Sequence, residues 1–315
     1  MTQRLTMERD LMSLELSART VSRTEGVDGV RALQRVLYRS AKQEPDRRFH
    51  VLFDKVARSD VLWRAWVQVR VNQWAPGIDG VTVGDVEESG VIEFLDELAA
   101  VLKAGSYRPK PLRRVHIPKQ GKPGTTRPLG IPCVRDRVVM TAAKIVLEPV
   151  FEADFLEVSH GFRPRRSAFQ ALEAVRHDAN RGRHWVLDAD IKACFDEIDD
   201  EALMRQVERR VCDRAMLKLV RCCLRAGIIE GGVLTDTEAG TPQGSPISPL
   251  LANIALHVLD VAWVKGHQRL GTLVRYADDF VILCATEERA ERARSEVAAI
   301  LAPLGLRLHP ERRRS

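Results

Sequence analysis

The sequence has few cysteines and histidines, and none of them stand at metal-ligand spacing. The six cysteines, at positions 133, 194, 212, 222, 223 and 284, include no Cys-x-x-Cys pair. The eight histidines are scattered and form no His-Glu-x-x-His or comparable cluster. The pattern predicts neither a disulfide framework nor a zinc site, so we expect reduced thiols in a cytoplasmic protein.

Long apolar runs are also missing. No run approaches the roughly 20 residues that a membrane span needs, and the first residues lack the apolar core of a signal peptide. We therefore expect no membrane partner. The hydrophobic fraction of 45% and the charged fraction of 29% are typical of a globular protein. A chain of 315 residues is long enough for one large domain or for several smaller ones.

Acidic residues are absent from residues 98–135, a stretch that carries many cations. Within it, residues 113–118 and 128–132 predict two strands around a Gly- and Pro-rich turn at 119–124. A hairpin with cations and no carboxylates favours phosphate binding, although a solvated basic face is the alternative. The formal net charge of +6 likewise favours a polyanionic partner.

Apolar residues at helical spacing predict most of the remaining elements. Residues 1–48 show only weak periodicity, and we interpret them as a loosely attached extension. A basic turn at 161–167 leads into a helix with Ser167 as its N-cap. A small hairpin is expected at 227–241. Helices are predicted at 49–72, 92–103, 136–157, 168–177, 201–211, 215–226, from the Pro-rich turn at 242–246 to about 263, and at 287–301.

Three aspartates occupy prominent positions in apolar surroundings. Asp190 closes a predicted strand at 185–191, and Asp278 with Asp279 forms the predicted tip of a hairpin at 273–284. Adjacent like charges are costly unless a cation neutralises them, and hard carboxylate oxygens suit Mg²⁺. The alternative is an Asp-rich turn without a ligand. If the strand lies beside the hairpin, the carboxylates can hold two ions roughly 3.5–4 Å apart for nucleotidyl transfer.

The motifs, taken in order, resemble those of group II intron-encoded reverse transcriptases. Tyr276-Ala277-Asp278-Asp279 is similar to the catalytic box of that family. The other matching segments are 75–82 (the N-terminal extra motif), 115–119 with 127–132 (the first finger motif), 160–168 (the second), 190–196 (the first catalytic Asp) and 241–254 (the Pro-Gln-Gly-Ser-Pro motif). Six motifs in the right order, between about residues 50 and 311, make the resemblance specific.

The resemblance implies an α+β right-hand polymerase, in which an antiparallel palm sheet is covered by helices. The N-terminal extension would be 1–48, the fingers 49–185 and the palm 186–315. The implied function is that of an RNA-directed DNA polymerase of a group II intron retroelement. Such an enzyme adds dNTPs to a DNA or RNA primer on an RNA template, for which intron RNA is the expected source.

The resemblance also implies residue roles. Asp190, Asp278 and Asp279, with the carbonyl of Ile191, would bind two Mg²⁺ ions, for which Mn²⁺ could substitute. The predicted nucleotide contacts are Lys119 and Arg127 (triphosphate), Phe195 (the gate beside the sugar 2′-carbon) and Gln243 with Gly244. The predicted template and primer contacts are Arg113, Arg163, Arg165 and Tyr276. An aromatic residue at position 195 could equally be a core residue, and that alternative stays open here.

One departure from the family pattern bears on activity. The family continues beyond the segment at 306–311 with the rest of the palm, a thumb and a maturase region, which this sequence does not contain. We therefore keep as alternatives a catalytically impaired fragment, an RNA-binding maturase-like remnant, and a CRISPR-associated or diversity-generating reverse transcriptase. A dimer, or a separate C-terminal thumb and maturase segment, would be a further expected partner.

Overall fold

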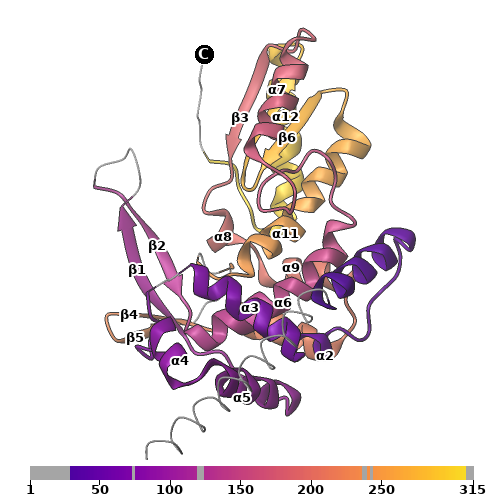
Figure 1. Cartoon of the computed structure of the whole chain (residues 1–315). Coiled ribbons are helices and arrows are strands. Elements are labelled where there is room, and N and C mark those ends of the chain that lie inside the picture. The colour runs from indigo at the N-terminus through magenta and orange to yellow at the C-terminus, as the bar shows by residue number, and fades with distance from the viewer. Residues whose placement is uncertain (1–28, 73–74, 119–123, 236–239, 242–243, 310–315) are drawn as a thin grey trace, which may run out of the picture.

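A computed structural model describes residues 29–72, 75–118, 124–235, 240–241 and 244–309. Its core is one large apolar cluster to which helices of both halves of the chain contribute. Two separate sheets flank these helices (Figure 1). Among the described residues, no helix combines the length and apolar character needed to cross a membrane.

The first half of the chain builds helices around a basic hairpin. The helices are α2 (Phe53–Val56), α3 (Ser59–Val71), α4 (Val83–Ser89), α5 (Val91–Lys103) and α6 (Val134–Glu152). The strands β1 (Leu112–Pro118) and β2 (Thr126–Ile131) are antiparallel, as the sequence predicted. The short strands β4 (Ile228–Glu230) and β5 (Val233–Thr235) complete this sheet in the order β2-β1-β4-β5, and β4 lies parallel to β1. That parallel pairing was not predicted.

The second half contains the three-stranded sheet. Its strands are β3 (Trp185–Asp190), β6 (Gly271–Tyr276) and β7 (Asp279–Cys284), all antiparallel in the order β3-β7-β6. The associated helices are α7 (Ala168–Ala179), α8 (Cys194–Glu197), α9 (Asp200–Glu208), α10 (Arg214–Leu224), α11 (Ser248–Ala262) and α12 (Glu287–Leu301), with π-helix η1 (Trp263–His267) and 3₁₀-helix η2 (Ala302–Leu304). The predicted α+β class, with an antiparallel sheet covered by helices, is confirmed.

The two faces of this sheet have different surroundings because side chains alternate along each strand. Leu273 and Ile282 belong to the main core, which also holds buried residues of α12. Val274 and Leu283 point the other way and pack against Ala171 of α7. By the same alternation Asp279 lies on the face that α7 partly covers, where a charged side chain can remain accessible.

One expectation differs from the structure. The sequence predicted a loosely attached extension up to residue 48, whereas residues 29–43 form a helix whose Val30, Leu37 and Ala41 are buried in the main core. The amide of Gln34 also donates to the carbonyl of Ile145 in α6. The weak periodicity concealed this packing because only a few apolar residues of the helix face the core.

Candidate active site

The structure brings the three aspartates to one end of the β3-β7-β6 sheet. Asp190 of β3 lies directly opposite Asp279 of β7, and Asp278 occupies the turn between β6 and β7. Residues opposed in this way point to the same face of a sheet and repel each other when they carry like charge. The strand register therefore brings the negative charges together at one accessible end of the sheet, as the sequence predicted for a cation site.

The turn that carries Asp278 is tight. Tyr276 pairs with Asp279, which leaves Ala277 and Asp278 as a two-residue loop. Ala277 has φ of 59°, a positive value of the kind that such hairpin loops favour at their first central residue. For an L-residue this conformation costs about 1 kcal/mol or more, so neighbouring contacts must hold it. Gly161 is one neighbour, because a Cβ at that position would clash with the backbone nitrogen of Ala277.

The electrostatics of the edge follow from this crowding. Burial raises the pKa of Asp278, the charges of Asp279 and Asp190 raise it further, and the charge of Arg127 opposes them. A divalent cation would relieve the same repulsion. The donor set, three carboxylates beside the backbone of Ile191, is of the hard oxygen type that Mg²⁺ accepts. Within the described part of the chain, no group of three or more His, Cys, Asp or Glu side chains is arranged so that it could hold a metal ion.

Three of the predicted nucleotide contacts meet at one cavity. Arg127 of β2, Phe195 of α8 and Gly244 line a cavity of about 370 Å³ between the two halves of the molecule. Gly244 has φ of 103°, and a Cβ there would lie 2.7 Å from the carbonyl oxygen of Gly130 in β2. Its small size therefore lets its loop approach the β1–β2 hairpin. Lys119 and Gln243, the other two predicted contacts, lie outside the described residues.

Phe195 serves both predicted alternatives, since it packs against the main core and lines the cavity. Its ring meets that of Phe162 edge to face, with centroids 6.4 Å apart. Phe162 is 50% exposed and has a positive φ of 56°. We did not single out Phe162 from the sequence. An aromatic residue beside the arginines of the motif at 160–168 was the signal that could have identified it.

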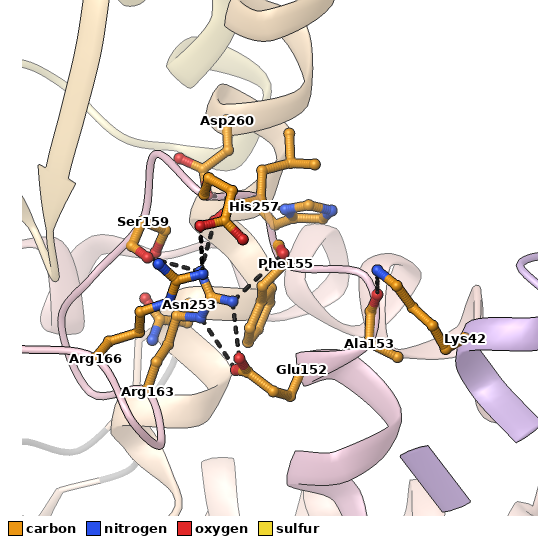
Figure 2. Close-up of polar contacts among 12 residues, drawn as sticks. Lys42, Glu152, Ala153, Phe155, Ser159, Arg163, Arg166, Asn253, His257 and Asp260 are labelled. Carbon is orange, nitrogen blue, oxygen red and sulfur yellow. Dashed lines mark hydrogen bonds and ion pairs between the residues drawn. The ribbon is translucent and has the colours of Figure 1, made fainter. Parts of the chain in front are cut away.

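The predicted template residues are in contrasting environments. Arg163 is buried, and its guanidinium donates to both carboxylate oxygens of Glu152 and to the carbonyl of Ser159 (Figure 2). It also donates to the carbonyl of Leu156. This arrangement favours a structural role for Arg163 over the template contact. Arg165 and Tyr276, by contrast, are exposed.

Some cations of the basic stretch at 98–135 have partners from other parts of the chain. Arg113 donates to the carbonyl of Pro76 at 2.9 Å, so it anchors the motif at 75–82. Glu230 of β4 lies 2.7 Å from the ring of His116 and 4.0 Å from Arg114. The predicted surface without carboxylates is therefore interrupted on β1, whereas Arg127 on β2 is exposed.

Further cavity residues come from helices that we did not link to the site. Gln68 and Asn72 belong to the end of α3, and Arg137, Thr141 and Lys144 to α6. Polar residues on one face of α6 were the available signal, but the sequence does not show which face meets the cavity. The cavity is thus lined by α3, α6 and β2 of the first half and by α8, the start of α11 and loops of the second.

Comparison with known proteins gives consistent matches. The family model described as reverse transcriptase (RNA-dependent DNA polymerase) matches residues 117–314. Protein YkfC of Escherichia coli is 34% identical over 89% of this chain and 83% of its own length. The group II intron-encoded protein LtrA of Lactococcus lactis is 36% identical over 70% of this chain, which spans only 36% of LtrA. A solved structure titled partial Cas6-RT-Cas1–Cas2 complex is 22% identical over 80% of this chain and 43% of that one, with a TM-score of 0.49.

Proposed function

The chain belongs to the reverse transcriptase family, and we propose from this premise that it is an RNA-directed DNA polymerase of a group II intron retroelement. The observation that carries the proposal is the register that sets Asp190 opposite Asp279, with Asp278 in the adjoining turn. The cavity lined by Arg127 and Phe195 provides the matching place for a nucleotide. The intron lineage is proposed from the likeness to LtrA and from the order of the motifs.

Two Mg²⁺ ions would be held by Asp190, Asp278 and Asp279, with the carbonyl of Ile191 as a further ligand. When bound, such ions stabilise the attacking and leaving oxygens of an in-line phosphoryl displacement. The donor set fits this requirement because it is hard, anionic and gathered at one accessible sheet edge. Mn²⁺ prefers similar ligands and could substitute.

The remaining side chains orient the substrate. Arg127, an exposed cation on the cavity wall, neutralises the charge of the incoming triphosphate. Phe195 presents its ring to the same cavity, where it would crowd a ribose 2′-hydroxyl and so favour deoxynucleotides. Phe162 supports that ring from its edge. Arg165 and Tyr276 are exposed and available to the template and primer backbones, contacts that position the strands without reading their sequence.

The experiment is primer extension with the full chain, a labelled DNA primer, an RNA template, dNTPs and Mg²⁺. Wild-type protein should extend the primer, and Asp278→Asn should abolish extension without lowering the thermal unfolding midpoint. Asp188→Asn is a suitable control, because Asp188 lies on β3 two residues before Asp190 and opposite Val281 rather than another carboxylate. If wild-type protein makes no DNA, or if Asp278→Asn extends primers as well as wild type, the proposed function is wrong.

A further inference from the structure

A fully buried ion pair lies directly beneath the turn that carries the catalytic aspartates. Arg275 on β6 and Asp260 on α11 both have 0% side-chain exposure. The arginine immediately precedes Tyr276 in the sequence. Removing two opposite charges from water carries a desolvation penalty that often exceeds their attraction, so stability alone does not account for such a pair. A geometric role is the better explanation, and the contacts of the guanidinium indicate which one.

The guanidinium of Arg275 makes five hydrogen bonds to four partners. Its Nε and Nη2 donate to the two carboxylate oxygens of Asp260, at 2.8 and 2.5 Å. Nη2 also donates to Oγ of Ser159 at 2.8 Å, and Nη1 to Oδ1 of Asn253 at 2.9 Å. The fifth bond runs from Nη1 to the carbonyl oxygen of Ala277, at 2.8 Å. Ala277 is the residue with positive φ, and its carbonyl belongs to the peptide unit that leads into Asp278.

The same network reaches the wall of the nucleotide cavity. Asn253, whose oxygen accepts from Arg275, donates through Nδ2 to the carbonyl of Gly161 at 2.9 Å. Gly161 lies so close to the backbone of Ala277 that a Cβ would not fit between them. The next residue, Phe162, lines the cavity. Figure 2 shows Ser159, Asn253 and Asp260 close together, with Arg163 beside them. One planar group thus joins α11, the loop around Gly161 and the aspartate turn.

We propose that Arg275 is a positioning residue: its guanidinium holds the Ala277–Asp278 turn, and through Asn253 the Gly161–Phe162 segment, in the geometry that metal binding and nucleotide addition require. The inference rests on the proposed function. It assigns to Arg275 no contact with substrate or metal. Asp260 fixes the plane of the guanidinium by its paired contact, so that Nη1 is directed at the turn.

The test is Arg275→Lys, which keeps the charge but replaces a planar group with five donors by a single ammonium that cannot span all of these partners. The matched control is Arg210→Lys. Arg210 is also buried, pairs with Asp154 at 3.2 Å and donates to the carbonyl of Ala41, away from the aspartates. The readouts are Mn²⁺ affinity, followed by electron paramagnetic resonance of the free ion, and single-nucleotide incorporation resolved into maximal rate and KM for dNTP.

For Arg275→Lys we expect about tenfold weaker Mn²⁺ binding and about a hundredfold slower maximal incorporation. KM for dNTP should stay within threefold of wild type, because the cavity wall at Arg127 is untouched. Arg210→Lys should match wild type in all three quantities. If folded Arg275→Lys binds Mn²⁺ and incorporates nucleotides as wild type does, the positioning role is wrong.

A second variant decides the matter if Arg275→Lys does not fold. Asn253→Ala leaves the contacts of Arg275 with Asp260 and Ala277 in place but removes the partner that shares Nη1. It should weaken Mn²⁺ binding severalfold and slow incorporation, and wild-type values would overturn the inference. Asp278→Asn separates the two proposals. Wild-type protein that binds Mn²⁺ no better than this variant contradicts the proposed function, whereas wild-type behaviour of the folded network variants contradicts the positioning role alone.

Discussion

The aspartate end of the β3-β7-β6 sheet and the paired strands β1 and β2 are supported in opposite ways. The aspartates lie on paired strands above the fully buried Arg275. Among the described residues of β1, Leu112 and Arg113 pair with β4, whereas residues 114–118 pair with β2 alone, and this outer part of the hairpin stands away from the helices (Figure 1). The carboxylates thus lie on a sheet packed against the core, and the cations on a hairpin that has fewer neighbouring elements. This division suits nucleotidyl transfer, where metal ligands need fixed geometry and triphosphates must enter and leave.

The largest effect should come from removing charge at the fixed end. Asp190→Asn should lower the rate of nucleotide addition by at least about a thousandfold, because one of the three carboxylates that would hold the metal ions is lost. Asp188→Asn, on the same strand, should change the rate less than threefold. Single-turnover incorporation measures both. Equal losses in the two variants would mean that the sheet edge is generally sensitive and that Asp190 has no special role.

A steric change at the same end should be nearly as damaging. Gly161→Ala places a Cβ where the backbone of Ala277 already lies, so the aspartate turn must shift. We expect about a hundredfold slower incorporation and weaker Mn²⁺ binding. Gly266→Ala is the control, because a Cβ there meets nothing within 4 Å. If Gly161→Ala is as active as wild type, the aspartate turn tolerates movement, and it is no more rigidly held than the hairpin.

The sequence sufficed for features that depend on local pattern. Short apolar runs rich in β-branched residues predicted β3 and the β6–β7 hairpin, and therefore placed Asp190 at a strand end and Asp278 with Asp279 at the hairpin turn. It was insufficient where a distant segment decides the environment of a side chain. Arg163 looks like a surface cation in its motif, but Glu152 and nearby carbonyls surround it.

The buried network beneath the turn illustrates the same limit. Its residues lie on α11, on β6 and in the loop before α7, so no single window of sequence contains it. The signal that existed was the presence of Asn253 and Asp260 seven residues apart in a mostly apolar helix, which places them on one face. A buried polar pair needs a partner. Only the folded chain identifies that partner as Arg275.

On the hairpin side, a substitution should affect binding more than chemistry. Arg127→Ala should raise KM for dNTP about tenfold and lower the maximal rate less than threefold, since in the proposed function the cation contacts the triphosphate and no metal. Lys110→Ala is a matched control, because Lys110 pairs with Asp79 at 3.3 Å outside the cavity. Steady-state incorporation at varied dNTP concentration measures both values. If Arg127→Ala lowers only the maximal rate and leaves KM for dNTP unchanged, Arg127 acts in the chemical step with the aspartates and not in nucleotide binding.

The smallest predicted effect concerns the connection between the two regions. Asp200 begins α9 and is buried, and its Oδ1 has no hydrogen-bond partner in the described structure. Burial raises its pKa to about 6, although the charge of Arg225 and a hydrogen bond with the backbone of Gly240 oppose the rise. Gly240 precedes Gly244 by four residues in the sequence, and Gly244 approaches Gly130 of β2. Ionisation of Asp200 therefore acts at Gly240, close in sequence to the residue that approaches the hairpin.

The sign of the pH effect follows from the direction of that shift. Because the folded chain binds the proton more tightly than the unfolded chain, the contribution of Asp200 to the free energy of unfolding is greatest below the ordinary carboxyl pKa. It falls as pH rises through about 6 and is then constant. Asp200→Asn should remove this slope and raise the free energy of unfolding at pH 8 relative to wild type by about 1 kcal/mol. Urea unfolding at pH 5 and pH 8, with the exposed Asp54→Asn as control, measures the difference. If Asp200→Asn keeps the wild-type dependence of the free energy of unfolding on pH, another group causes that dependence, and Asp200 does not couple pH to this part of the fold.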